Sequence, residues 1–174
     1  RPETIETLRR AGCLVWMLTG DKLETAVSIA NTCRLIDADG ELAIVQESDF
    51  VSQGDTGGKI NPYFLRDKSR EAVEDAKRGC KFGLVIEGGA LQHALSTDES
   101  QAQFLALCRA SSGVVCCRVS PIQKARVTTL MKKRGGFVTM GVGDGANDVG
   151  MIKAAHIGVG ISGREGRAAV LASD

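Results

Sequence analysis

The segment Phe137-Val-Thr-Met-Gly-Val-Gly-Asp-Gly-Ala-Asn-Asp148 shows the pattern that decides the fold of this chain. A largely apolar run leads into a glycine-rich polar loop, and Asn147 and Asp148 stand where a helix is predicted to begin. Apolar runs of this kind are typical of strands in a parallel sheet that is buried on both faces. The segment therefore predicts a strand, a polar loop at its carboxyl end, and a helix.

The same alternation of strand and helix extends over the rest of the chain. Strands are predicted at residues 13–18, 82–86, 114–117, 137–142 and 157–161, with a weaker candidate at 42–45. Helices are predicted at residues 2–12, 21–30, 63–78, 101–110, 121–134, 147–155 and 165–172. This alternation predicts an α/β fold with a doubly wound, mostly parallel, Rossmann-like sheet.

Length and composition favour one globular domain over residues 1–174. A net charge of +1 and an aromatic content of 4% argue against a nucleic-acid-binding protein, which usually has a basic face and stacking aromatics. No apolar run approaches the roughly 18 residues of a membrane span. The polar, glycine-rich stretch at about 47–61 is expected to be a mobile surface insertion.

The six cysteines do not form a recognisable metal site. No two of them have CxxC spacing, and the two histidines do not complete a zinc set. Cys116 and Cys117 are adjacent in a predicted strand, so their side chains should point to opposite faces of the sheet. Buried, reduced thiols of a cytosolic protein are the expected state.

Three loops at strand ends carry the candidate chemistry, because ligands of open α/β sheets bind beyond the carboxyl ends of the strands. The first loop is Thr19-Gly20-Asp21. Gly20 would allow the backbone to approach a ligand, and Thr19 offers a hydroxyl and an N–H to phosphate oxygens. Alternatively, Asp21 is the N-cap of the next helix and forms a capping box with Glu24.

The second loop is Ser120-Pro-Ile-Gln-Lys124. Ser120 and Gln123 predict a capping box, with Pro121 at the first helical position. A lysine in the first turn opposes the helix dipole, and Lys124 lies on the same helix row as Val127 and Met131. Lys124 is therefore either a phosphate-binding cation or a solvated surface lysine.

The third loop is Gly143-Asp-Gly-Ala-Asn-Asp148. Asp144, Asp148 and the amide of Asn147 supply hard oxygen ligands of the kind that Mg²⁺ prefers. Asn147 and Asp148 could instead be ordinary helix caps, but capping does not explain Asp144. This loop is interpreted as a magnesium site.

In this order, the three loops resemble the phosphorylation domain of P-type ATPases, within the haloacid dehalogenase superfamily. The match covers Thr-Gly-Asp at 19–21, Lys124 and Gly-Asp-Gly-Ala-Asn-Asp at 143–148. The segments Trp16-Met-Leu-Thr-Gly-Asp-Lys-Leu-Glu-Thr-Ala26 and Val115-Cys-Cys-Arg-Val-Ser-Pro-Ile-Gln-Lys-Ala125 are most similar to the P4 branch, the phospholipid flippases.

The resemblance implies a role for each matched residue. Thr19, Gly20 and Lys124 would hold the transferred phosphoryl group of ATP, and Asp144 and Asp148 would bind Mg²⁺. Asn147 would support that site, and Asp21 would lie close to the nucleotide. Thr19, Lys124 and Asp148 would be the catalytic residues of this chain.

The family's nucleophile, an aspartate in an Asp-Lys-Thr-Gly-Thr segment, does not occur in this sequence. Asp67-Lys-Ser-Arg70 and Asp37-Ala-Asp39 are interpreted as surface features. The chain is thus expected to be an inactive fragment of a flippase whose central strand is missing. Direct pairing of the neighbouring strands at 15–18 and 138–142, filling of the gap by another copy, or poor stability is expected to follow.

The resemblance also implies partners and a location. These are the nucleotide-binding, actuator and membrane domains of the same polypeptide, a phospholipid substrate, and an optional accessory subunit. The chain would lie at the cytosolic face of a membrane. A soluble phosphatase of the same superfamily and a non-catalytic anion-binding module are the alternatives.

Overall fold

The computed structural model describes residues 2–36, 40–51, 61, 63–162 and 167–173. It divides into two compact units, Arg1–Val119 and Ser120–Asp174, and each is described by itself. Most of the predicted insertion, at 52–60, and the Asp37-Ala-Asp39 segment lie outside the described residues. The expectation of one domain stays a prediction.

The first unit contains a parallel four-stranded sheet in the order β1-β4-β3-β2. Its strands are β1 (Trp16–Leu18), β2 (Glu41–Val45), β3 (Phe82–Glu87) and β4 (Gly113–Cys117). All five residues of β4 and the first five of β3 are buried, as expected for central strands of a parallel sheet. The predicted α/β class with a parallel, Rossmann-like sheet is confirmed.

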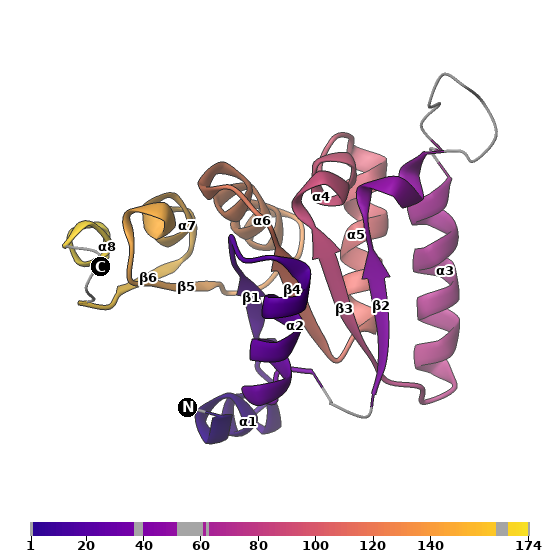
Figure 1. Ribbon diagram of the computed structural model, residues 1–174, viewed down its shortest axis with the longest axis horizontal. Coiled ribbons are helices and arrows are strands. Elements are labelled where there is room, and N and C mark those ends of the chain that lie inside the picture. The colour runs from indigo at the N-terminus through magenta and orange to yellow at the C-terminus, as the bar shows by residue number, and fades with distance from the viewer. Residues whose placement is uncertain (1, 37–39, 52–60, 62, 163–166, 174) are drawn as a thin grey trace. The chain divides into compact units, whose positions relative to one another are not determined.

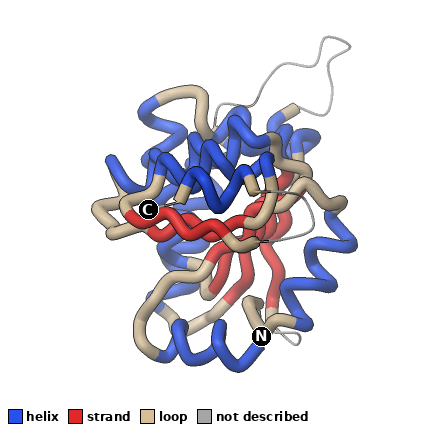
Figure 2. Tube along the Cα trace, turned by 90° about the vertical axis from the view of Figure 1, so that its left-hand side faces the viewer, coloured by secondary structure: helices blue, strands red, loops and turns tan. Residues whose placement is uncertain are grey.

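Helices cover both faces of this sheet. They are α1 (Pro2–Arg10), α2 (Leu23–Thr32), α3 (Phe64–Lys77), α4 (Gly88–Ala94) and α5 (Asp98–Ala110), with a short 3₁₀ helix η1 (Glu47–Phe50). Figure 1 shows α2 in front of the sheet and α5 behind it, and Figure 2 distinguishes the helices (blue) from the strands (red). Ala26 and Ala30 of α2 pack in one buried cluster with Val85, Val115 and Cys117 of the sheet.

The cysteines follow the predicted geometry only in part. Cys117 lies in the cluster beneath α2, whereas burial and the neighbouring Cys116 both raise the pKa of Cys108 on α5. The adjacent cysteines therefore face opposite sides of the sheet, as predicted. Cys13 and Cys80 are exposed, so the expectation that the thiols are buried holds for only part of the set.

The second unit contains a parallel pair of strands with helices on one side. Its elements are α6 (Pro121–Lys133), β5 (Met140–Gly143), the 3₁₀ helix η2 (Ala146–Asp148), α7 (Val149–Ala154), β6 (Ile157–Gly160) and α8 (Ala168–Ala172). Gly141 and Gly158 lie against α7, and Gly160 lies against α8. The large side chains Met140, Val142 and Ile157 are exposed.

Several predicted boundaries differ from the observed ones. The predicted strand at 13–18 forms only from Trp16, and the strand at 137–142 begins at Met140. Helix α4 was not predicted, because it begins with two glycines that disfavour helix. The predicted insertion begins with an ordered turn, since η1 buries Phe50.

The strands that precede Thr19 and Asp144 belong to different units. Among the described residues, β1 pairs with β4 and β5 pairs with β6, in two separate sheets. Direct pairing of these two strands, like the other two expected outcomes, stays a prediction. No helix in the described part of the chain is long and apolar enough to cross a membrane.

Candidate functional site

Backbone hydrogen bonds attach the Thr19–Asp21 loop to the segment that follows β4. Thr19 N–H donates to the Cys116 carbonyl at 2.9 Å, which extends the β1–β4 ladder by one residue. Beyond it, Val119 N–H donates to the Thr19 carbonyl at 3.1 Å, and Arg118 N–H donates to the Asp21 carbonyl at 2.9 Å. The loop is therefore fixed at the carboxyl end of the sheet.

The side chain of Asp21 does not cap the following helix. The N-cap of α2 is Lys22, whose side chain makes no capping hydrogen bond. The Asp21 carboxylate instead accepts a hydrogen bond from the Thr19 hydroxyl at 2.8 Å, and Asp21 N–H donates to that hydroxyl at 3.2 Å. The predicted N-cap at Asp21 is thus wrong, because a nearer donor holds its carboxylate within the loop.

Neither backbone conformation nor packing within the first unit requires glycine at position 20. Gly20 is outside the positive-φ set, and an added Cβ would meet only the Val119 carbonyl oxygen, at 3.9 Å. The space above the Gly20 backbone is therefore open within this unit. An open glycine in a loop that presents N–H and hydroxyl groups is compatible with close approach of a phosphate.

The start of α6 has the predicted capping box. Ser120 N–H donates to the Gln123 side chain at 2.9 Å, and Gln123 N–H donates to the Ser120 hydroxyl at 3.3 Å. Pro121 occupies the first turn. This box fixes the helix start and so places Lys124 on the first turn of α6.

Lys124 is buried and paired, which excludes the interpretation as a solvated surface lysine. Its Nζ lies 2.8 Å from Oδ1 of Asp148, and the two side chains are only 11% and 13% exposed. Val127 and Met131, on the same helix row, are buried as well. A buried ammonium is stable only beside an anion, and here Asp148 supplies it.

The Gly143–Asp148 loop brings Asp148 close to Asp144. Asp144 N–H donates to Oδ2 of Asp148 at 3.3 Å. A Cβ at Gly143 would come within 2.3–2.7 Å of the Asp148 side chain, so glycine is required there for the carboxylate to fit. Asp148 is the N-cap of α7 but makes no side-chain capping bond, because Lys124 and the Asp144 amide already occupy its oxygens.

Asp144 offers the more accessible carboxylate of the two. Its residue is exposed, as is Asn147, while Asp148 is partly buried. Among the described residues no group of three or more His, Cys, Asp or Glu side chains is close enough to hold a metal ion. The donor set fits a hydrated Mg²⁺ bound through one carboxylate, which suits Asp144 better than the already paired Asp148.

The structure thus brings together Thr19 with Asp21, and Lys124 with Asp148 and Asp144. It also shows an interaction that the sequence reasoning missed: Glu87, at the end of β3, is paired with Arg118 at 3.3 Å. The signal was present, because Glu87 directly follows a fully buried apolar run, as Asp144 follows its own strand. The same strand-end rule applied to β3 would have identified Glu87, but not its partner Arg118.

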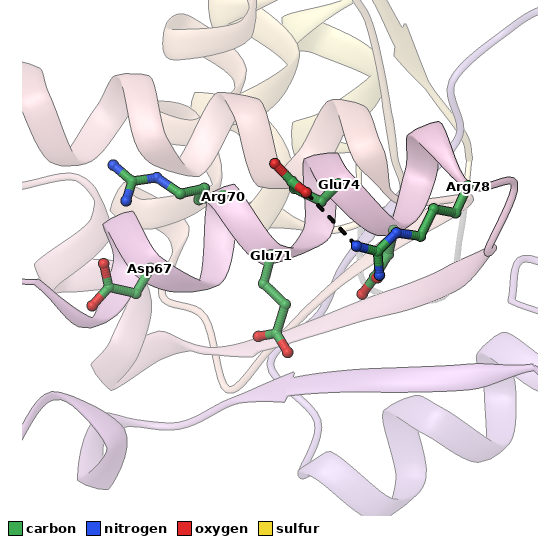
Figure 3. A pocket seen from close by; sticks show the side chains of 6 residues that line it. Asp67, Arg70, Glu71, Glu74 and Arg78 are labelled. Atoms are coloured by element: carbon green, nitrogen blue, oxygen red, sulfur yellow. Dashed lines mark ion pairs between the residues drawn. The ribbon is translucent and has the colours of Figure 1, made fainter.

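A depression on the surface of α3 has no comparable chemistry. Figure 3 shows that its charged side chains project from a single helix. They are Asp67, Arg70, Glu71, Glu74, Asp75 and Arg78. The Glu74–Arg78 pair is 3.8 Å apart and both partners are exposed. As predicted, Asp67 belongs to a solvated surface.

Comparison with known proteins gives many similar sequences, although no family model matches the chain. The chain is 42% identical over 189 residues to "Phospholipid-transporting ATPase DNF2" of Saccharomyces cerevisiae. It is 47% identical over 176 residues to "Probable phospholipid-transporting ATPase 4" of Arabidopsis thaliana, and 44% identical over 193 residues to "Phospholipid-transporting ATPase ID" of Homo sapiens. Each alignment covers 99% of this chain but only 12–16% of the relative.

Proposed function

We propose that this chain is part of the phosphorylation domain of an ATP-driven flippase. The premise is that the chain is homologous, over nearly its whole length, to a segment of the P4-type phospholipid-transporting ATPases. In this role it supplies the phosphate- and Mg²⁺-binding loops for formation and hydrolysis of an aspartyl phosphate. The aspartate nucleophile lies outside this chain. The phospholipid, the accessory subunit and the other domains belong to the same proposal.

The buried Lys124–Asp148 pair is the observation that carries the proposal. The Nζ of Lys124 lies 2.8 Å from the Asp148 carboxylate, and the lysine side chain is only 11% exposed. The ammonium group is therefore held in one place at the start of α6. Phosphoryl transfer to a carboxylate requires a fixed cation, because negative charge on the phosphate must approach negative charge on the nucleophile. Lys124 would supply that positive charge without reorganising.

The first unit contributes hydrogen-bond donors. The Thr19–Asp21 loop offers backbone N–H groups and the open backbone of Gly20, so it would orient the phosphoryl oxygens. The Thr19 hydroxyl is already directed to Asp21 at 2.8 Å, so phosphate binding would have to compete with this bond. Asp21 therefore helps to set the orientation of the Thr19 hydroxyl.

The second unit contributes the Mg²⁺ ligand and the lysine. Asp144 is the exposed carboxylate that would hold the metal, and Asn147 would support it. When bound, Mg²⁺ supplies neutralisation of phosphate charge. Asp148 would act on Lys124, because its two oxygens accept from Lys124 Nζ and the Asp144 amide.

The test is phosphorylation of the full-length polypeptide that carries this chain, using radiolabelled ATP and Mg²⁺. A hydroxylamine-sensitive phosphoenzyme is expected, whose breakdown is accelerated by a phospholipid. The isolated chain is expected to hydrolyse neither ATP nor small phosphate esters above background. Turnover by the isolated chain that disappears in Asp144→Asn would overturn the proposal, because it would place a complete active site in these residues.

A further inference from the structure

Side chains around Glu87 connect the ends of three neighbouring strands. Glu87 is the last residue of β3, and its side chain is 17% exposed. Its Oε1 lies 3.3 Å from Nε of Arg118, which follows β4. Its Oε2 accepts a hydrogen bond from the side chain of Gln46, which follows β2, at 3.4 Å. Both carboxylate oxygens are thus in use.

The backbone of Arg118 adopts a conformation that is unfavourable for its residue type. Arg34 and Arg118 are the non-glycine residues with positive φ in the described part of the chain, at 56° and 52°. Arg34 follows the C-cap of α2, where a left-handed residue is an ordinary helix ending. Arg118 ends no helix. Its left-handed conformation costs about 1–2 kcal/mol, so surrounding contacts must hold it.

This conformation serves the Thr19–Asp21 loop. It directs the N–H of Arg118 to the Asp21 carbonyl at 2.9 Å and the next N–H, of Val119, to the Thr19 carbonyl at 3.1 Å. The two amides thus hold both ends of the loop that the proposed function assigns to phosphate. A relaxed Arg118 backbone would turn at least one of these N–H groups away.

We propose that Glu87 is a positioning residue for the Thr19–Asp21 loop and acts through Arg118. The carboxylate fixes the Arg118 side chain by a charge-assisted contact, and the fixed side chain holds the strained backbone in place. Gln46 orients the carboxylate from the opposite side. The contribution of Glu87 to phosphoryl transfer rests on the proposed function, whereas its effect on the loop does not.

Hydrogen–deuterium exchange of the full-length polypeptide tests the effect on the loop. Glu87→Gln keeps the shape of the side chain but removes its charge. Exchange in peptides covering residues 113–120 should rise about tenfold, on the scale of a lost hydrogen bond to a charged group. The matched control is Glu74→Gln, which removes an exposed glutamate–arginine pair on α3 and should leave these peptides unchanged. Unchanged exchange in Glu87→Gln would overturn the proposal.

If Glu87→Gln fails to fold, Arg118→Gln gives the same test from the exposed side of the pair, since Arg118 is 54% exposed. The reaction is tested by a double-variant cycle on phosphoenzyme formation. Each single variant should slow phosphoenzyme formation about tenfold. The double variant should be no slower than either single variant, because Glu87 and Arg118 act through the same contact. Additive losses, or a normal rate in Glu87→Gln, would overturn the role in the reaction. Absence of any phosphoenzyme in the unmodified polypeptide would refute the proposed function and leave the exchange result to decide the positioning.

Discussion

The ion pair between Lys124 and Asp148 shows how a single residue can be costly to the fold and still useful to the site. Removing an ammonium from water costs several kcal/mol, and a close carboxylate offsets part of that cost. The Nζ of Lys124 lies 2.8 Å from Oδ1 of Asp148 and both side chains are nearly buried, so moving either one would leave the other charge buried without its partner. Packing of α6 and the ion pair together fix the position of the ammonium group, which the proposed phosphate-binding role of Lys124 requires.

Replacing Lys124 should therefore affect the reaction more than any exposed lysine does. In the full-length polypeptide, we expect Lys124→Ala to slow phosphoenzyme formation about 10²–10³-fold, the usual scale for one electrostatic stabiliser. Rapid-quench measurement of the phosphorylated fraction checks this. Lys133, exposed on the last turn of α6, is the matched control, and Lys133→Ala should react at the normal rate. A near-normal rate in Lys124→Ala would remove Lys124 from the site.

The two aspartates of the same loop should separate in their effects on stability. Asp148→Ala leaves Lys124 buried without its anion and should lower the free energy of unfolding by about 2–3 kcal/mol. Asp144 is exposed, so Asp144→Ala should change it by less than about 0.5 kcal/mol. Urea denaturation of both variants measures the difference. Equal losses would show that Lys124 does not depend on Asp148.

Metal binding should be weak in this chain alone. Asp144 is one accessible carboxylate, and the oxygens of Asp148 are already hydrogen-bonded. Most ligands of a bound Mg²⁺ would therefore be water, which places the dissociation constant at about the millimolar level. Calorimetric titration should give this weak signal and lose it in Asp144→Ala. Tight binding that survives Asp144→Ala would place the metal elsewhere.

Local residue patterns predicted only part of this site. The row of Lys124, Val127 and Met131 indicated a lysine that leans toward the packed face, because helix periodicity depends on the sequence alone, but it left a solvated surface lysine open as the alternative. The role of Asp21 was not predictable in this way. A capping box and an Asp–Thr turn share the same sequence, and competition between the two donors is decided by backbone geometry. The Glu87–Arg118 pair joins residues 31 positions apart and required the sheet order.

At the scale of elements, continuous apolar runs predicted the central strands β3 and β4 well, because both faces of these strands are buried. Helix α4 was missed, since Gly88 and Gly89 lower helix propensity while burial of Ala90, Leu91 and Ala94 stabilises the helix. Tertiary packing thus overrode local propensity. The start of β5 at Met140 could not be predicted either, because Phe137 and Val138 are residue types that favour strands.

Two glycines of the second unit should respond in opposite directions to the same substitution. In Gly160→Ala the new Cβ would lie 2.2 Å from the backbone oxygen of Ala169, so α8 must move away from β6. We expect a loss of about 1–3 kcal/mol in the free energy of unfolding. Gly150 lies in α7, and its Cβ would meet Ala125 at an ordinary 3.4 Å. Gly150→Ala should gain up to about 1 kcal/mol from helix propensity.

Thermal or urea unfolding of these two variants measures both signs. Their difference matters more than either value, because both replace glycine by alanine and alter the unfolded chain equally. A destabilised Gly150→Ala together with a normal Gly160→Ala would mean that α8 does not pack on β6 as described.

On the scale of the whole molecule, the segments that resemble the flippases predicted the relationship, and the relatives confirm it. The chain spans 12–16% of the length of those relatives, so motif matching identified what the segment is similar to better than what it does alone. The lack of an Asp-Lys-Thr-Gly-Thr segment in the sequence predicted that the nucleophile is outside it. Local patterns could not predict the division into two sheets, because strand pairing depends on long-range contacts.

The exposed face of β5 and β6 leads to the last prediction, which concerns association. Met140, Val142 and Ile157 are 61%, 47% and 46% exposed, and parallel pairing places Met140 beside Ile157. Neighbouring apolar side chains on a short sheet favour contact with another surface. Among the described residues β5 and β6 pair only with each other, so each strand has an unpaired edge that adds to this tendency. We therefore expect the isolated chain to self-associate as its concentration rises, measured by light scattering coupled to gel filtration. Met140→Thr combined with Val142→Thr should reduce the association, whereas Ile122→Thr, at an exposed position on α6, should not. A chain that stays monomeric at all concentrations and unfolds cooperatively at high temperature would contradict this account. It would show that the exposed apolar side chains of β5 and β6 neither drive association nor lower stability.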